Sequence, residues 1–206
     1  MFATSFEVIA EPEAEPLSLD LARAWARLDT YGTPPGHPLD PLLTAVLIPG
    51  ARKTAQQHCG RAFGVQTVRL SLDAFPRGAE GICLPLPPAV EVLSVAYVDP
   101  DGDAQTLPFP SLYLDRAQEP AWLLPGYGYA WPSVREQANA VTIEYRCGHA
   151  AVPEPVLHAM MLLVTAGIEN PSEVSERQTY ALAHGVEALL QPYVCYAGRV
   201  PRGLAR

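Results

Sequence analysis

The segment from Ile82 to Leu107 constrains the fold of this chain most strongly. It reads ICLPLPPAVEVLSVAYVDPDGDAQTL, with a proline-rich entry, a run of β-branched residues and an Asp-Gly turn, a combination typical of strands joined by a tight turn. Helical patterns precede and follow it, in LSLDLARAWARLDT and EPVLHAMMLLVTAGIENP. This order predicts an α+β fold in which a mostly antiparallel β unit is inserted into a small helical bundle.

Changes in periodicity and composition give the predicted boundaries of these parts. The helical body is expected to comprise residues 17–63 and 150–193, and the inserted β unit residues 64–149. The acidic segment 1–16 is expected to be flexible, because its charges and prolines oppose burial. Residues 194–206 form a basic C-terminal tail.

Two helices are predicted before the β unit. The first follows from the helical spacing of Leu17, Leu21, Trp25 and Leu28, with Ser18 as its N-cap. A Gly- and Pro-rich loop, TYGTPPGHPLDP, separates it from a second helix that begins near Pro41 and runs to about Ala62. Pro49-Gly50 lies inside this second helix. Because proline removes a backbone donor and clashes with the preceding turn, a kink or a break is expected there.

Two further helices are predicted after the β unit. An almost continuous apolar series from Val156 to Ile168 follows Pro153, which predicts a helix buried on most sides at the centre of the core. Asn170-Pro171 ends that helix, and a last short helix includes Val186 to Leu190 and ends at Pro192.

The β unit contains four predicted strands. Val65, Thr67, Arg69 and Ser71 alternate with Gln66, Val68, Leu70 and Leu72, which is the period of a strand. The other three candidates are residues 90–98, 111–114 and 140–145. An aromatic loop between Trp122 and Trp131 has two possible partners, its own sheet or a neighbouring copy, and the sequence does not decide between them.

Composition excludes several function classes. With 206 residues and 49% hydrophobic residues, the chain has enough apolar surface for a core. A formal charge of -8 argues against a nucleic-acid-binding surface spread over the whole molecule. No apolar run approaches the roughly 20 residues of a membrane span. The acidic N-terminus lacks the basic region of a signal peptide, so a cytosolic compartment without a membrane partner is predicted.

Cysteine and histidine spacings give no metal, redox or catalytic motif. Cys59, Cys83, Cys147 and Cys195 are widely separated and are predicted to be buried free thiols. His58-Cys59 and Cys147-Gly148-His149 are conceivable pairs of a nucleophile and a base, but neither lies in the motif of a known thiol enzyme. His158, on an apolar helix, is interpreted as a core or interface histidine.

Two acidic or glycine-rich stretches resemble binding motifs only superficially. Asp99, Asp101 and Asp103 surround Gly102 without the further ligands and distal glutamate of a calcium loop, so a hairpin turn is predicted instead. GYGYAW does not follow a strand and open a helix, as a phosphate loop must. No catalytic, cofactor-binding or metal-binding residue is therefore predicted, and the chain is not expected to be an enzyme.

The succession of motifs along the chain resembles the head-to-tail connector, or adaptor, proteins of long-tailed bacteriophages and prophages. The resemblance covers roughly residues 17–193 and is carried by the order and spacing of several segments. They are LSLDLARAWARLD, LIPGARKTAQQHCGRAF, VQTVRLSLDAFP, ICLPLPPAVEVLSVAYVDPDGDAQTL, VTIEYRCG, VPEPVLHAMMLLVTAGIEN and GVEALLQPY.

This resemblance implies a virion structural protein. In that family, a helical bundle with an inserted β unit assembles into a ring under the portal and extends the channel through which DNA passes. The implied partners are the portal protein, neighbouring copies in a twelvefold ring, and head-closure or tail proteins. No cofactor is implied, and DNA is expected to pass without specific binding. The implied locations are the virion and, during assembly, the host cytoplasm.

Two other function classes remain open from the sequence. One is a different ring-forming virion component, such as a head-closure or tail-terminator protein. The other is an enzyme or ligand-binding protein, for which a pocket containing both Cys147 and His149 would be the supporting observation.

The C-terminal tail carries the one partner-binding hypothesis that names residues. Arg199, Arg202 and Arg206 stand in an otherwise acidic protein. A flexible basic segment can become ordered on an acidic surface through charge-assisted hydrogen bonds. We therefore expect these arginines to dock on the portal; the alternative is a solvated tail without a partner.

Overall fold

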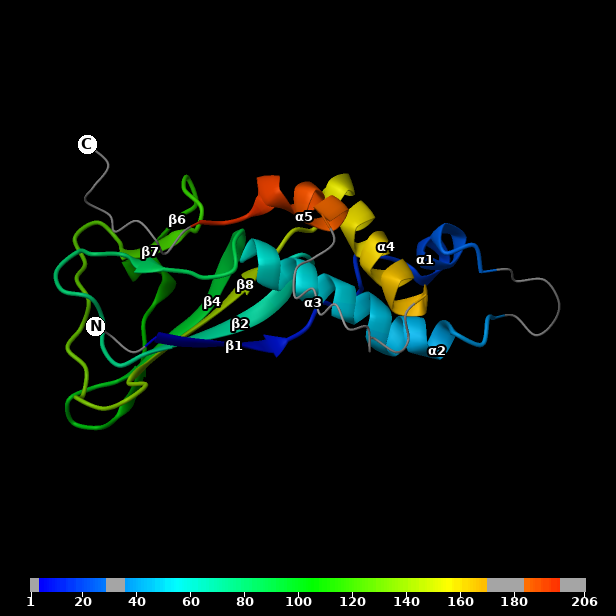
Figure 1. The fold of residues 1–206 in the computed structure, drawn as a ribbon. Helices are drawn as coiled ribbons and strands as arrows, with labels where there is room; N and C mark the ends of the chain where they lie inside the picture. Colours follow the sequence, from blue (N-terminus) through cyan, green and yellow to red (C-terminus); the bar gives the residue numbers. More distant parts are fainter. Residues whose placement is uncertain (1–3, 29–35, 170–183, 197–206) are drawn as a thin grey trace, which may run out of the picture. The chain divides into compact units, whose positions relative to one another are not determined.

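The computed structural model describes residues 4–28, 36–169 and 184–196, and these fall into two compact units (Figure 1). The first, called the β unit, comprises residues 4–13, Gly60–His149 and 195–196. The second, called the helical unit, comprises the described residues of Ala14–Cys59 and Ala150–Val194. The fold class is α+β, as predicted.

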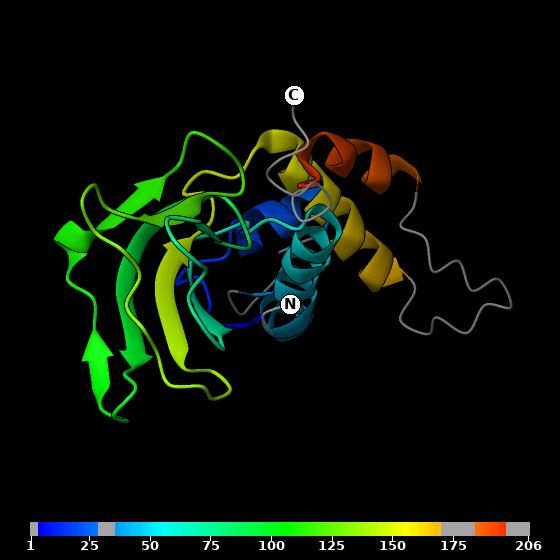
Figure 2. The same cartoon turned by 90° about the vertical axis from the view of Figure 1, so that its left-hand side faces the viewer.

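The β unit contains two antiparallel sheets. The larger sheet has five strands in the order β1-β2-β8-β4-β5, and the smaller has three in the order β3-β7-β6. Figures 1 and 2 show these strands from two sides. The strands of the larger sheet are β1 (Thr4–Ala10), β2 (Gln66–Leu72), β4 (Ala89–Val98), β5 (Ala104–Thr106) and β8 (Val141–Cys147). Those of the smaller sheet are β3 (Ile82–Cys83), β6 (Leu112–Asp115) and β7 (Trp122–Pro125).

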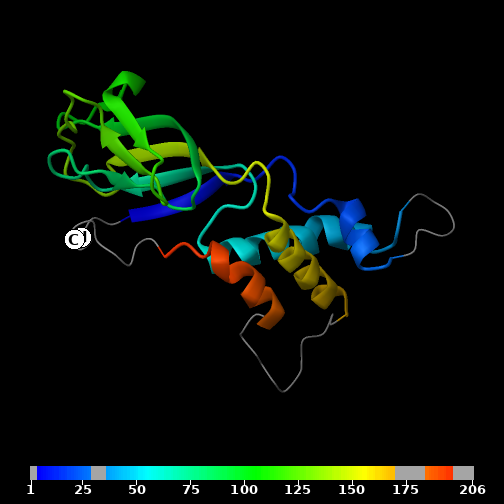
Figure 3. The ribbon, with the colours of Figure 1, turned by 90° about the horizontal axis from the view of Figure 1, so that it is seen from above.

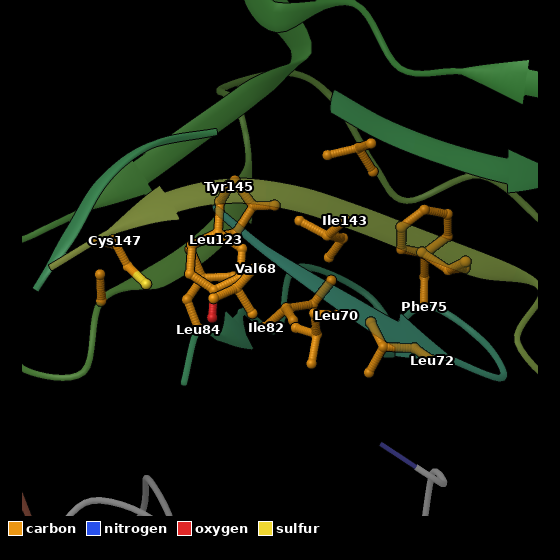
Figure 4. Packing of buried hydrophobic residues seen from close by; sticks show 14 of the residues in the cluster. Val68, Leu70, Leu72, Phe75, Ile82, Leu84, Leu123, Ile143, Tyr145 and Cys147 are labelled. Carbon is orange, nitrogen blue, oxygen red and sulfur yellow. The ribbon is translucent and has the colours of Figure 1, made fainter. Parts of the chain in front are cut away.

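Alternate residues of β2 and β8 supply the centre of the core. In β2, Gln66, Val68, Leu70 and Leu72 are buried while their neighbours are half-buried, so the predicted alternation is confirmed. Side chains from β3 and β7 complete the same cluster, in which Figure 4 labels Val68, Leu70, Leu123, Ile143 and Tyr145 among others. Burying one such aliphatic side chain contributes about 1.5–3 kcal/mol.

The N-terminal segment differs from the expectation of a flexible acidic stretch. Residues 4–10 form β1, which pairs antiparallel with β2 from Thr4 opposite Leu72 to Val8 opposite Val68. Phe6, Val8 and Ile9 give this segment strand propensity that its acidic flanks conceal. The short strands β3, β5 and β7 are likewise additions to the four predicted strands, which correspond to β2, β4, β6 and β8.

The chain enters and leaves the long insertion of the β unit at adjacent points. Phe63 forms a parallel bridge with His149, whose N–H donates to the Ala62 carbonyl at 3.2 Å. Gly148 has φ +114°, and a Cβ built on it would lie 2.0 Å from the carbonyl oxygen of Gly64. Only glycine allows so close an approach of the two backbones.

The described residues of the helical unit form five α-helices and two short segments of other helix types. Its α1, Leu19–Trp25, begins at Ser18, whose hydroxyl accepts from the Leu21 N–H as the sequence predicted. The other elements are α2 (Asp40–Leu42), the π-helical segment η1 (Leu43–Leu47), α3 (Ile48–Cys59), α4 (Glu154–Glu169), α5 (His184–Leu190) and the 3₁₀ segment η3 (Gln191–Tyr193).

Pro49 is accommodated by a change of helix type. The π-helical segment η1 ends at Leu47, and α3 begins at Ile48 immediately before the proline. In a regular α-helix the Pro49 ring would clash with the carbonyl of Ala45, which would also lose its partner. A π-helical turn shifts the hydrogen-bond pattern by one residue and relieves this conflict. The helix therefore continues through residues 40–59 without the break that was one of the two predicted outcomes.

The burial of α4 is greatest along one face. Val156, Ala159, Met160 and Val164 are buried, and they repeat at the spacing of a single helix face. The remaining apolar side chains, such as Leu157 and Leu163, are only half-buried. Only Glu154, Ala166 and Glu169 of α4 are exposed, so the helix is fully buried along one face and half-buried on most of its other sides.

A buried arginine anchors the segment that precedes α1. The Arg52 side chain on α3 is 1% exposed, and its Nε and Nη2 donate to the two carboxylate oxygens of Glu15 at 2.8 and 3.2 Å. Its Nη1 also donates to the Gln56 side-chain oxygen at 3.3 Å. A buried cation that loses its counter-charge is strongly destabilising.

We expect Glu15→Gln to lower the free energy of unfolding by about 3 kcal/mol, because it removes the carboxylate that the buried Arg52 guanidinium binds through two nitrogens. The amide keeps the size of the side chain, so packing is preserved. Urea denaturation followed by far-ultraviolet circular dichroism measures the change. Glu13→Gln, at an exposed position, is the matched control and should have almost no effect; an equal loss in both variants would contradict the role of the pair.

A second ion pair fixes the start of α2 to α1. The Asp40 carboxylate accepts from Arg23 Nε at 2.7 Å, from a second nitrogen of the same guanidinium, and from the backbone N–H of His37 at 2.6 Å. The hydrogen bonds from Arg23 are the main cause that lowers the pKa of Asp40.

This lowered pKa predicts a pH dependence of stability. A carboxyl whose pKa is lower in the folded state stabilises the protein fully above its unfolded pKa of about 3.9, and the contribution is lost as the pH falls through the lower folded value. The stability difference between the wild type and Asp40→Asn should thus be constant near neutral pH and shrink in acid. Urea denaturation over this pH range measures it.

Candidate assembly surfaces

Four exposed aromatic side chains lie on β6 and on the segments that precede β6 and follow β7. We call Phe109, Tyr113, Tyr127 and Tyr129 the aromatic surface; all four are more than half exposed. The pairing of β6 with β7 places Leu112 opposite Pro125, and the Gly126 N–H donates to the Ser111 carbonyl at 2.8 Å. The turn that carries the two later tyrosines therefore lies beside the segment that carries Phe109 and Tyr113.

The aromatic surface is also free of charge. Residues 104–114 and 120–134 contain no Asp, Glu, Lys or Arg. Large, exposed, uncharged aromatic side chains are the residues that protein interfaces favour. An interface is thus the function that this part of the β unit supports best.

The two tryptophans of the same stretch lie within the unit and do not belong to this surface. The Trp131 ring stacks on Phe75 with the ring centroids 4.8 Å apart, and its Nε1–H donates to the Glu80 carbonyl at 2.8 Å. Trp122 is a half-buried residue of β7. The sequence did not decide whether the aromatic loop contacts its own sheet or a neighbouring copy. In the structure the tryptophans pack on their own unit, and the tyrosines are exposed.

A second uncovered apolar surface lies on β1, the edge strand of the larger sheet. Phe6 is opposite Leu70 and Val8 is opposite Val68, so both point to the face of the sheet that carries the core. They are nevertheless 51% and 37% exposed. We call these two residues the β1 surface.

The helical unit exposes apolar residues at two places. Leu21 and Trp25 are four residues apart on α1, and Leu42 and Val46 are four residues apart on α2 and η1. Each pair therefore occupies one side of its helix. The Trp25 ring contacts the His158 ring edge-on, with the centroids 5.3 Å apart, which agrees with the interpretation of His158 as a packing residue.

The outer face of the larger sheet is polar and its charges are paired. Arg69 lies opposite both Glu7 and Glu144 and forms ion pairs with them at 3.1 and 2.8 Å, while Arg146 pairs with Glu91 at 3.0 Å. Cross-strand pairs of opposite charge stabilise a sheet modestly. They also neutralise the arginines, so this face is not a basic surface.

The cysteine and histidine pairs do not form a reactive site. Cys147 is fully buried, and burial raises the pKa of its thiol to about 12. Cys59 is also buried, and its thiol donates to the Leu190 carbonyl at 3.6 Å. The His149 ring stacks on Phe63, and burial is the main cause that lowers its pKa. A thiol with a raised pKa is not a nucleophile at neutral pH.

We expect Cys59 and Cys147 of the folded protein to resist alkylation by iodoacetamide at about pH 8, because both are buried and Cys147 remains protonated. Mass spectrometry of the digested protein measures modification at each position. Half-buried Cys83 and Cys195 serve as internal comparisons, and a denatured sample should be modified at all 4 cysteines. Rapid modification of Cys147 in the folded protein would contradict this burial.

The acidic segment after β4 is a hairpin turn, as predicted. The Asp99 carboxylate accepts from the backbone N–H groups of Asp101, Gly102 and Asp103 and from the Gln105 side chain. The Gln105 hydrogen bond is the largest cause that lowers the pKa of Asp99. Within residues 4–28, 36–169 and 184–196, no group of three or more His, Cys, Asp and Glu side chains is arranged to hold a metal ion.

Two further sequence predictions concern the arginines of the C-terminal tail and the absence of a membrane span. Arg199, Arg202 and Arg206 lie outside the described residues. No helix in the described part of the chain combines the length and hydropathy that crossing a membrane requires.

Comparison with solved structures identifies chains of the same fold. A chain in the neck of an empty gene transfer agent particle, computed with C6 symmetry, matches with a TM-score of 0.75 and 21% identity over 97% of this chain and 98% of that chain. Chains in the native virion of a gene transfer agent and in the neck of the native particle with C12 symmetry match with TM-scores of 0.73 and 0.66, both at 21% identity. The match to the virion chain covers 96% of this chain and 98% of that chain. The match to the native neck chain covers 97% of this chain and 98% of that chain. No protein-family profile and no curated protein sequence matches the chain. The similarity to these neck and virion chains over almost the whole length shows that this chain shares their fold.

Proposed function

We propose that this protein is a virion structural protein that forms a ring at the head-tail neck of a phage-like particle. The observation that carries the proposal is the match to a neck chain over 97% of this chain and 98% of the other, with a TM-score of 0.75. The match includes both units, and almost no part of either chain lies outside it. This supports a shared role as well as a shared fold.

Within the neck, we propose the role of an adaptor that sits under the portal and extends the DNA channel. The order of sequence motifs resembles that class of protein, and the observed α+β architecture agrees with the resemblance. The portal, neighbouring copies and head-closure or tail proteins are the proposed partners. Arg199, Arg202 and Arg206 of the tail are the proposed contacts to the portal.

The surfaces described above suit a ring subunit. Each unit exposes apolar side chains at two separate places, and a ring of identical copies requires two different surfaces that bind each other in succession. A monomeric protein rarely leaves several such groups uncovered. The exposed side chains of both units thus support assembly with other copies.

The charge distribution suits a channel through which DNA moves freely. Arg23, Arg52, Arg61, Arg69 and Arg146 each form an ion pair with a carboxylate. The formal net charge of -8 also disfavours binding of DNA phosphates to the chain as a whole. A channel wall built from this protein would be neutral or acidic and would not retain the passing DNA.

We expect electron microscopy of the purified protein mixed with the portal protein of its own particle to show rings of this protein bound to the portal. The protein alone is the comparison, since a ring that depends on the portal should be rare without it. A stable symmetric dimer that never binds the portal would contradict the proposal. Rings that bind only a tail component would favour a head-closure or tail-terminator protein instead.

The same experiment tests the tail. A chain truncated after Tyr196 removes all three arginines and keeps the described residues. If the tail docks on the portal, the truncated protein should remain folded by circular dichroism and bind the portal more weakly. Equal binding of the truncated and full-length chains would show that the tail has no docking role.

A further inference from the structure

We propose that successive copies in the ring contact each other through the β unit, with the aromatic surface of one copy packed on the β1 surface of the next. This inference rests on the proposed function, because it assumes that the protein forms a ring. It assigns the two uncovered apolar surfaces of the β unit to one interface.

The first argument is the position of the two surfaces. β1 is the last strand at one edge of the five-stranded sheet, and β6 is the last strand at one edge of the three-stranded sheet. Figures 1 and 3 show β1 and β6 on opposite sides of the β unit. Two different surfaces on opposite sides of one unit can bind in succession from copy to copy, whereas a single self-complementary surface stops at a dimer.

The second argument is chemical complementarity. Both surfaces are apolar, and the aromatic surface lies in segments without a charged residue. Phe6 and Val8 already point to the core face of their sheet, where a covering layer is missing. The rings of Tyr127 and Tyr129 supply such a layer, and their hydroxyl groups can remain in contact with water at its rim. Tyrosines that enter an apolar site in this way are typical energetic centres of protein interfaces.

Site-directed crosslinking tests the proposed contact. The background is a variant with Cys83→Ser and Cys195→Ser, which leaves only the two buried thiols. Phe6→Cys and Tyr127→Cys are introduced separately and together. Assembled protein, on the portal if the ring requires it, is then treated with a short bis-maleimide and separated by denaturing electrophoresis.

The expected results distinguish a successive contact from a symmetric one. The double variant should give a series of crosslinked oligomers larger than a dimer, because each copy is linked to both neighbours. An equal mixture of the two single variants should contain dimers and no larger species, and each single variant alone should remain monomeric. Leu93→Cys combined with Tyr127→Cys is the matched control, since Leu93 is exposed at a different strand, β4.

Other outcomes overturn the inference in different ways. Dimers of Tyr127→Cys alone would show that the aromatic surface binds itself. Rings that are visible by electron microscopy while the double variant gives no crosslinked series would refute this interface and leave the proposed function intact. If Tyr127→Cys is crosslinked to the portal instead, the aromatic surface binds the portal. Absence of rings from the wild-type protein with portal would refute both proposals together.

Discussion

The burial of one face of β2 and β8 is the constraint on which the β unit depends. These two strands lie next to each other inside the five-stranded sheet, and their alternate side chains meet the smaller sheet in one core. A shift of β2 by one residue would turn Val68 toward water and bring Arg69 into the core. The ion pair between Arg69 and Glu144 exists on the outer face only in the observed register, so packing and electrostatics favour the same pairing.

In the helical unit, ion pairs fix the position of chain segments, whereas in the β unit apolar side chains of the two sheets do so. Arg52 holds the segment before α1 through Glu15, and Arg23 holds the start of α2 through Asp40. In both cases the planar guanidinium binds a carboxylate with two nitrogens, which fixes direction as well as distance. The segment before α1 and the start of α2 thereby gain defined positions in the helical unit.

Periodicity in the sequence predicted the elements that carry a repeated pattern and missed those defined by distant partners. The alternation in β2 and the Asp-Gly hairpin after β4 are local signals, and both were confirmed. β1 escaped prediction because acidic residues flank it and its partner β2 lies far along the chain.

The candidate surfaces show the same limit. The aromatic stretch was visible in the sequence, but the division between Trp131 and the exposed tyrosines depends on Phe75, more than fifty residues earlier. Likewise, nothing in the period of α3 shows that Arg52 is buried, because its partner Glu15 lies 37 residues before it in the chain. Contacts of this kind are properties of the folded chain and have no local signature.

The close approach of Gly64 and Gly148 brings the two ends of the long insertion of the β unit together. Its two ends are held together by the bond from His149 to Ala62, so the strands between them form a closed excursion of the chain. An excursion whose ends are adjacent can lengthen, shorten or be exchanged without moving the segments that flank it. The strands and loops of the insertion can therefore vary in evolution while the helical unit keeps its own packing.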